Sequence, residues 1–311
     1  MLDPEDQGAD RGTARETVEA PFARGLERLA TARDDVVVLT ADLSKWTDVL
    51  PFATARPARF VQVGMAEQNL MGVTAGLAKT GFLPVAVTFG VFATRRAYDQ
   101  IAMSLATRPC RAILAGFLPG LDSRFRGTHQ AIDDLAIIRS LPGVTVLDPG
   151  DATELEEAVL LAAEVDGLTY IRCSRGRIEK LLPPGLTIGP AREMARGDGG
   201  VGVVTTGAAT RWVAEVRGAG TGHLHVPTLK PFPAEQVARW AARFDRIVTV
   251  ENHLLHGGLG ASVAAALATG GVPVPLAMRG IDDRWGEYGR PEFSRARLGL
   301  GPDDLRGALA A

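Results

Sequence analysis

Short runs of apolar residues recur along the chain, and each is followed by a stretch with helical periodicity. The run VVVLT at 36–40 is apolar without alternation, which is typical of a strand buried on both faces of a parallel sheet. Comparable runs and helical stretches alternate between residues 17 and 173, with connections long enough for parallel pairing. The sequence therefore predicts an α/β fold with a doubly wound, mainly parallel sheet.

The alternation is interrupted once, by a segment rich in proline and glycine at 179–198, which favours a linker. A chain of 311 residues is long enough for two domains that each bury a core. We therefore expect a first domain over residues 16–178 and a second, smaller, doubly wound α/β domain over residues 199–311. Residues 1–15 are polar, and we expect them to be disordered.

Composition narrows the classes of function. The net charge is −2, so no strong field favours nucleic acid or an anionic membrane. Cys110 and Cys173 are far apart in the sequence and match neither a metal motif nor a disulfide framework. No stretch reaches the length of a membrane span, and the acidic N-terminus has no signal-peptide core. We expect a cytoplasmic protein that binds neither nucleic acid nor membrane and supplies no metal ligand.

One carboxylate, Glu67, is placed unusually. In a helix over residues 66–79, positions 67, 70, 71, 74, 77 and 78 share a face, and Glu67 begins this otherwise apolar stripe. A carboxylate that faces an apolar surface is costly unless it is protonated or paired. A glutamate in the first turn of a helix is also favoured by the macrodipole and could point to water. The helical pattern leaves both interpretations open.

Three further motifs accompany Glu67. They are the aromatic segment FGVF at 89–92 with the RRAYDQ that follows at 95–100, the loop sequence GTHQ at 127–130, and CSRG at 173–176. Most of these motifs, like the loop at 42–47, lie at or just beyond the carboxyl end of an expected strand. Open α/β sheets bind their ligands at this edge, so we expect the motifs to converge on one site.

In order, spacing and local context, these motifs resemble the C-terminal half of transketolase, and more broadly the thiamine-diphosphate enzymes that include deoxyxylulose phosphate synthase. The resemblance extends from residue 17 to about residue 300, and VTVENHLLHGGLG at 248–260 matches the family's C-terminal domain. It implies a pyrimidine-binding domain followed by a transketolase C-terminal-like domain. It also implies a transferase of carbohydrate metabolism that moves a two-carbon ketol unit from a ketose or ketose phosphate to an aldehyde.

The resemblance assigns roles to individual residues. Glu67 resembles the catalytic glutamate that hydrogen-bonds the aminopyrimidine ring of thiamine diphosphate, and Phe92 with Phe89 would pack against that ring. His129 resembles the catalytic loop histidine that contacts substrate hydroxyls, and Arg175 resembles the arginine that holds a substrate phosphate. The other expected contacts are Asp42 and Leu43 with the cofactor, and Ser44, Arg95 and Arg96 with the substrate. The alternatives are a core residue for Phe89, a solvated loop residue for His129 and a strand-end ion pair for Arg175.

The half of the site that holds the diphosphate is missing. The family binds Mg²⁺ and the diphosphate through Gly-Asp-Gly followed downstream by asparagines. Gly197-Asp198-Gly199 has these letters, but Asn69 and Asn252 are the chain's two asparagines, and neither lies at the required spacing. The segment is expected to be a linker turn. The resemblance thus implies that an N-terminal transketolase-like partner subunit holds the diphosphate and Mg²⁺, in an α₂β₂ heterotetramer with contact between β subunits.

The sequence departs from transketolase where the sugar is recognised. Phe125 and Phe117 stand at positions where the family has an aspartate and a phosphate-binding histidine, and Asp122, Arg124 or Arg126 could compensate. The donor, the acceptor and the phosphorylation of the substrate therefore stay open. One alternative function is the β subunit of a 2-oxo acid dehydrogenase, or a deoxyxylulose phosphate synthase-like enzyme, which decarboxylates a 2-oxo acid. Another is a non-catalytic assembly subunit that keeps the fold.

Overall fold

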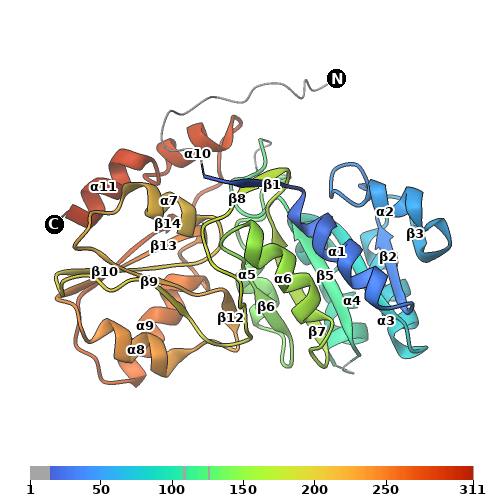
Figure 1. Cartoon of the computed structure of the whole chain (residues 1–311), viewed down its shortest axis with the longest axis horizontal. Helices are drawn as coiled ribbons and strands as arrows, with labels where there is room; N and C mark the ends of the chain where they lie inside the picture. The colour runs from blue at the N-terminus through green and yellow to red at the C-terminus, as the bar shows by residue number, and fades with distance from the viewer. Residues whose placement is uncertain (1–14, 108–109, 125–126, 311) are drawn as a thin grey trace.

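The protein is described by a computed structural model that covers residues 15–107, 110–124 and 127–310. Apart from Arg15, the segment expected to be disordered lies outside these residues, as do Phe125 and Arg126. Two units, each a sheet flanked by helices, lie side by side, and the chain passes from one to the other near the middle of the molecule (Figure 1). Within the described residues, no helix combines the length and apolar character needed to span a bilayer.

The first sheet has the strand order β12-β6-β7-β5-β4-β2-β3. All neighbours in it pair in parallel except β12 with β6. Its parallel strands are β2 (Val36–Thr40), β3 (Phe60–Gln62), β4 (Leu83–Phe89), β5 (Ala112–Phe117), β6 (Thr145–Leu147) and β7 (Leu168–Cys173). The segments that flank or connect them are α1 (Pro21–Ala32), α2 (Leu50–Ala55), η1 (Pro57–Arg59), α3 (Glu67–Lys79), α4 (Tyr98–Gln100), α5 (Asp134–Arg139) and α6 (Ala152–Ala162).

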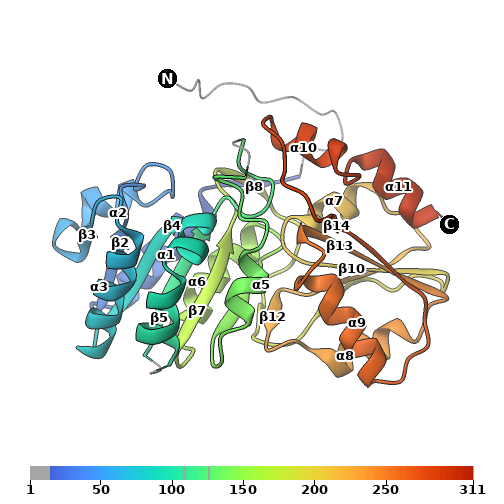
Figure 2. The same cartoon turned by 180° about the vertical axis from the view of Figure 1, so that it is seen from behind.

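Both faces of this sheet are covered, which explains its continuous apolar runs. Val36 and Val38 of β2 pack in one cluster with residues of α1 and α6, whereas Val37 and Leu39 pack in another with residues of α3 and α5. Successive side chains of a strand point to opposite faces, so a strand between two helical layers needs apolar residues at every position. The two views of the molecule show the helices on the two sides of the sheet (Figure 2).

The second sheet has the order β14-β13-β10-β11-β9, and only β9 (Arg192–Ala195) at its edge is antiparallel. The other strands are β10 (Val201–Thr205), β11 (Gly222–His225), β13 (Arg246–Leu254) and β14 (Leu276–Ile281). The helices of this unit are α7 (Ala209–Val216), α8 (Ala234–Ala241), α9 (Leu259–Thr269), α10 (Pro291–Arg297) and α11 (Pro302–Ala310). The structure confirms the predicted α/β class with two mainly parallel sheets.

Several segments tie the two units together. β12 (Thr228–Lys230) leaves the second unit and pairs antiparallel with β6, so it forms the edge of the first sheet. β9 lies inside the proline-rich segment at 179–198 and pairs with β11. Near the start of the chain, β1 (Thr17–Glu19) pairs with β8 (Arg177–Glu179), and helix α1 begins after it, at Pro21.

Candidate active site

Glu67 is the first residue of α3, and only 2% of it is exposed. Leu70, Met71 and Thr74 of the same face are also buried, as the helical pattern predicts. The carboxylate is paired, because Arg96 donates a hydrogen bond from Nη1 to Oε2 of Glu67 at 2.7 Å. The structure therefore accommodates the acid by an ion pair rather than by exposure to water.

The residues after β4 form the aromatic part of the site. The segment that follows is not one regular helix but contains two π-helical segments, η2 (Phe92–Arg96) and η3 (Ile101–Ala106), and such segments are frequent at functional sites. The rings of Phe89 and Phe92 are stacked with centroids 5.9 Å apart. The guanidinium carbon of Arg96 lies 4.5 Å from the Phe92 ring centre. The pair made by Arg96 and Glu67 thus lies directly beside an aromatic surface.

His129 joins this group from a separate loop. Its ring is edge-on to Phe92 with centroids 5.2 Å apart and lies 6.4 Å from Phe89. Partial burial lowers the pKa of His129, and the positive charge of Arg96 lowers it further. Nδ1 lies 2.8 Å from Oγ1 of Thr128. The structure therefore brings together Glu67, Phe89, Phe92, Arg96 and His129, with an imidazole that favours its neutral form.

Arg95 is hydrogen-bonded to the loop that carries His129. Its Nε lies 2.9 Å and 2.8 Å from the two carboxylate oxygens of Asp133. Nη1 donates to the carbonyl of Gly127 and Nη2 to the carbonyl of Gln130, at 3.1 and 3.3 Å. The resemblance assigns Arg95 to the substrate. In the structure, its guanidinium is instead hydrogen-bonded to residues on both sides of His129 in the loop.

The loop after β2 lies at the same edge of the sheet. Asp42 is exposed with φ of 60°, and its backbone N–H donates to Oε1 of Gln62 at 2.7 Å. Leu43 is half-buried against the hydrophobic cluster that includes residues of α1 and α6. The carbonyl of Ser44 accepts hydrogen bonds from the backbone of residues 49 and 50, so the loop is internally braced.

Arg175 contacts this loop. Its Nε lies 3.3 Å from Oδ1 of Asp48, its Nη2 donates to the carbonyl of Lys45 at 3.2 Å, and its guanidinium carbon lies 5.1 Å from the Trp46 ring centre. Burial raises the pKa of Asp48 despite this cation. Arg175 thus forms the ion pair that the sequence leaves as an alternative, on a side chain that stays partly exposed.

The second unit contributes an aromatic wall that sequence reasoning missed. Trp285, in the loop after β14, lies so close to Gly127 that a methyl group added to this glycine would come within 3.0 Å of indole Cε3. The Arg95 guanidinium carbon is 5.0 Å from the same ring centre. Trp285 and Tyr288 line an open, apolar pocket of about 350 Å³ together with Gly127 and Thr128. The only sequence signal is two large aromatics in the polar stretch DDRWGEYG.

A buried ionic network fixes the carboxyl end of β7, and the sequence pattern also missed it. Arg172 donates from Nε to Asp134 at 2.8 Å, from Nη1 to Asp148 at 3.2 Å and from Nη2 to the Asn252 carbonyl at 3.0 Å. Tyr170 donates its hydroxyl to Asp134 at 2.7 Å. The network joins α5, β6 and the second unit at the base of the segment that carries Arg175.

Of the two positions that differ from transketolase, Phe117 lies within the described residues, and its role there is structural. Phe117 is fully buried and packs edge-to-face on Phe22 with centroids 5.2 Å apart. Asp122 accepts from Ser174 Oγ at 3.1 Å and from Asn252 Nδ2 at 3.2 Å. Arg124 is exposed.

The Gly-Asp-Gly segment at 197–199 is a turn with two left-handed glycines, and the backbone N–H of Gly200 after it donates to the Asp198 carboxylate. Among the described residues, no group of three acidic, histidine or cysteine side chains is arranged to hold a metal ion.

Residues 17–180 match the family described as transketolase, pyrimidine binding domain, and residues 201–305 match transketolase, C-terminal domain. The chain belongs to the transketolase family. Members of the transketolase family and the related deoxyxylulose phosphate synthases depend on thiamine diphosphate. The sequence-based assignment of family and of the two domain types is confirmed.

Individual relatives agree with the family. An uncharacterised transketolase family protein of Sinorhizobium fredii, y4mN, is 38% identical and aligns with 89% of this chain and 84% of its own length. The 6-deoxy-6-sulfo-D-fructose transketolase subunit SqwH of a Clostridium species is 36% identical over 86% of this chain and 85% of its own. A solved structure described as a split gene transketolase, inactive beta4 tetramer, is 34% identical with a TM-score of 0.85, covering 94% of this chain and 96% of that one.

Proposed function

We propose that the chain is the pyrimidine-binding subunit of a two-subunit, thiamine-diphosphate-dependent transketolase. The complete enzyme transfers a two-carbon ketol unit from a ketose or ketose phosphate donor to an aldehyde acceptor. The observation that carries the proposal is the buried Glu67 at the start of α3 beside the ring of Phe92, in a chain that matches the pyrimidine-binding domain. A carboxylate next to an aromatic surface is the arrangement that a flat heterocycle with a hydrogen-bonding nitrogen requires.

These residues fit the pyrimidine end of the cofactor. Glu67 would hold a proton at its carboxylate against a ring nitrogen, Phe89 and Phe92 would pack on the ring, and the Asp42–Leu43 backbone would border it. Bound thiamine diphosphate supplies the thiazolium carbon on which the two-carbon unit is carried. Arg96 donates to Oε2 of Glu67, so the ring nitrogen would bond to the other carboxylate oxygen or share Oε2 with Arg96.

The substrate would lie between the loops at the carboxyl edge of the first sheet. His129 would exchange hydrogen bonds with its hydroxyl groups, because its lowered pKa keeps one ring nitrogen free of a proton at neutral pH. Ser44 and Arg175 would bind the distal part of the substrate, and a phosphate or sulfonate there would compete with Asp48 for the guanidinium. Arg95 would act by positioning the His129 loop, since its donors already bind that loop.

We propose that an N-terminal transketolase-type subunit holds the diphosphate and Mg²⁺. The chain has two asparagines, and Asn252 is buried against Asp122 rather than placed beside the turn at 197–199. The similar structure described as a split gene transketolase, inactive beta4 tetramer, supports a β subunit that needs a partner. The complete assembly would be an α₂β₂ heterotetramer with β–β contact, located in the cytoplasm.

The test is reconstitution with the N-terminal transketolase-type subunit of the same source. Ketose phosphate with an aldehyde acceptor should be turned over, whereas pyruvate as donor should not, and the reverse result would favour a 2-oxo acid enzyme. Glu67→Gln should lower kcat/KM by about 100-fold or more, as expected for loss of a proton-transfer group. Full activity of this variant would instead support a non-catalytic assembly subunit. By calorimetry, this chain alone should not bind thiamine diphosphate tightly.

A further inference from the structure

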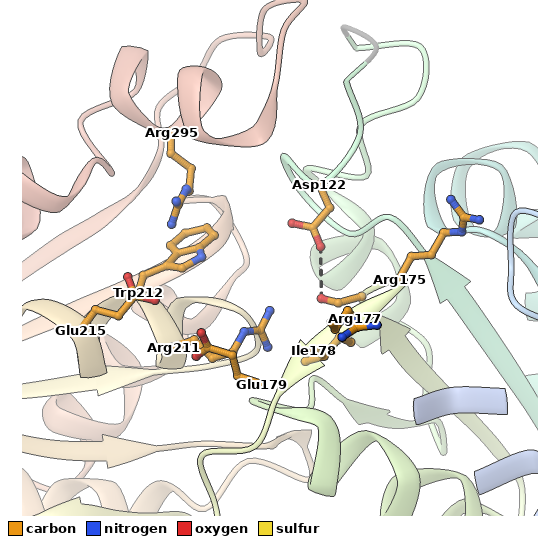
Figure 3. A pocket seen from close by; sticks show the side chains of 10 residues that line it. Asp122, Arg175, Arg177, Ile178, Glu179, Arg211, Trp212, Glu215 and Arg295 are labelled. Carbon is orange, nitrogen blue, oxygen red and sulfur yellow. Dashed lines mark hydrogen bonds between the residues drawn. The ribbon is translucent and has the colours of Figure 1, made fainter. Parts of the chain in front are cut away.

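A second pocket lies between the two units, away from the aromatic site. It has a volume of about 290 Å³. The first unit lines it with the segment from Ser174 to Glu179 and with Asp122, and the second unit lines it with α7 and α10 (Figure 3). The side chains that matter for its chemistry are Asp122, Glu179, Glu215, Arg177, Arg211 and Arg295.

Arg295 and Arg211 have spare hydrogen-bond donors here. The guanidinium carbon of Arg295 lies 4.6 Å from the centre of the Trp212 ring, and burial lowers the pKa of Arg295. Arg211 donates from Nη1 to the carbonyl of Gly150. Among the described residues, no carboxylate lies within 4.0 Å of the guanidinium nitrogens of either arginine. Both guanidinium groups point into the space between the units (Figure 3).

Three other charged side chains of the pocket, Arg177, Glu179 and Asp122, already have partners on the protein, and Glu215 lies within the electrostatic influence of Arg295 and Arg211. Arg177 pairs with Glu19 at 3.3 Å, and Glu179 pairs with Arg15 at 3.2 Å. Asp122 is bonded to Ser174 and Asn252, and burial raises its pKa. Burial also raises the pKa of Glu215, and the neighbouring Glu179 adds to that shift. Arg175 borders the pocket, but its side chain turns away toward Asp48 and the loop after β2, where it is proposed to bind substrate (Figure 3).

We propose that this pocket binds a small organic oxyanion, a carboxylate or a phosphate ester, through Arg211 and Arg295. The planar guanidinium groups suit bidentate contact with oxyanions, and stacking on Trp212 holds one of them in place before the ligand arrives. Both arginines belong to the second unit, whereas the opposite wall belongs to the first, so a bound anion would link the units. The proposal does not depend on the transketolase activity.

Calorimetry on the full chain at fixed ionic strength tests this site, with inorganic phosphate and citrate as the two probes. We expect saturable binding of at least one probe and a loss of affinity of tenfold or more in both Arg295→Gln and Arg211→Gln. Arg295→Lys keeps the charge without the planar fork and should fall between these variants and the wild type. Arg306→Gln, on the exposed face of α11, is the matched control and should leave affinity unchanged.

Two results would overturn the proposal. One is the absence of saturable binding of either probe to a folded wild-type chain. The other is binding that Arg175→Gln abolishes while Arg295→Gln leaves it intact, because the anion would then bind beside Arg175 at the proposed substrate site. Stronger binding of phosphate than of citrate would indicate a phosphate ester as the natural ligand, and the reverse a polycarboxylate.

Discussion

Arg96 donates from Nη1 to Oε2 of Glu67 across 2.7 Å, although half of the Arg96 side chain is exposed and only 2% of that of Glu67 is. The ion pair is therefore open to solvent on one side and closed on the other. The same guanidinium lies over Phe92, where the pyrimidine ring is proposed to pack. Arg96 thus neutralises Glu67 at the place where the ring is proposed to bind.

This relationship predicts coupling between the two residues. Arg96→Gln should destabilise the full chain by about 1–3 kcal/mol, because it leaves a buried carboxylate without its cation. Glu67→Gln combined with Arg96→Gln should recover part of that loss. Urea denaturation of the wild type, both single variants and the double variant gives the coupling energy, expected at about 0.5–3 kcal/mol. Strictly additive effects would contradict a functional ion pair.

The next prediction separates loop positioning from substrate contact. Asp133→Asn removes the charge that holds Arg95 but touches no proposed substrate contact. If Arg95 positions the His129 loop, Asp133→Asn and Arg95→Gln should lower kcat/KM of the reconstituted enzyme to similar extents, by about tenfold or more. Their effects should also be non-additive in the double variant. Near-normal activity of Asp133→Asn beside an inactive Arg95→Gln would assign Arg95 to the substrate.

The pKa of His129 should lie below the ordinary histidine value. Its pKa is lowered by burial and by Arg96, so the neutral imidazole should persist as the pH falls through 6.5. Arg96→Gln removes a positive charge and should raise the pKa of His129 toward that ordinary value. The imidazole proton signals in NMR spectra of the full chain report this, with His129→Gln identifying the resonance. An unchanged midpoint in Arg96→Gln would show that the cation has no influence.

Local sequence patterns predict much of the fold. The alternation of apolar runs and helical stretches predicts the parallel sheets, because strands covered on both faces need apolar residues at each position. Glu67 also stands out from its helix, since it is the one charged residue in the stripe that it begins. The exchange of β12 into the first sheet was not predictable in this way, because a three-residue strand has too short a pattern to reveal its partner.

The sequence did not predict which partners the charged side chains would bind. Arg95 and Arg96 are adjacent, yet one binds Asp133 and the other Glu67. The two π-helical segments change the direction of the side chains, which a regular helical wheel does not anticipate. Trp285 reaches the His129 loop from more than 150 residues away, as its contact with Gly127 shows. Such contacts depend on how the two units pack, which local periodicity does not encode.

Arg172 provides the strongest test of how the carboxyl edge is held. Its guanidinium compensates Asp134 and Asp148, and all three side chains are nearly inaccessible to solvent. Arg172→Met should destabilise the full chain by about 3–5 kcal/mol, because it leaves buried carboxylates without a cation. Arg279→Met, on the exposed part of β14, is the matched control and should change stability by less than about 0.5 kcal/mol. A loss below about 1 kcal/mol for Arg172→Met in urea denaturation would mean that the network contributes little to stability.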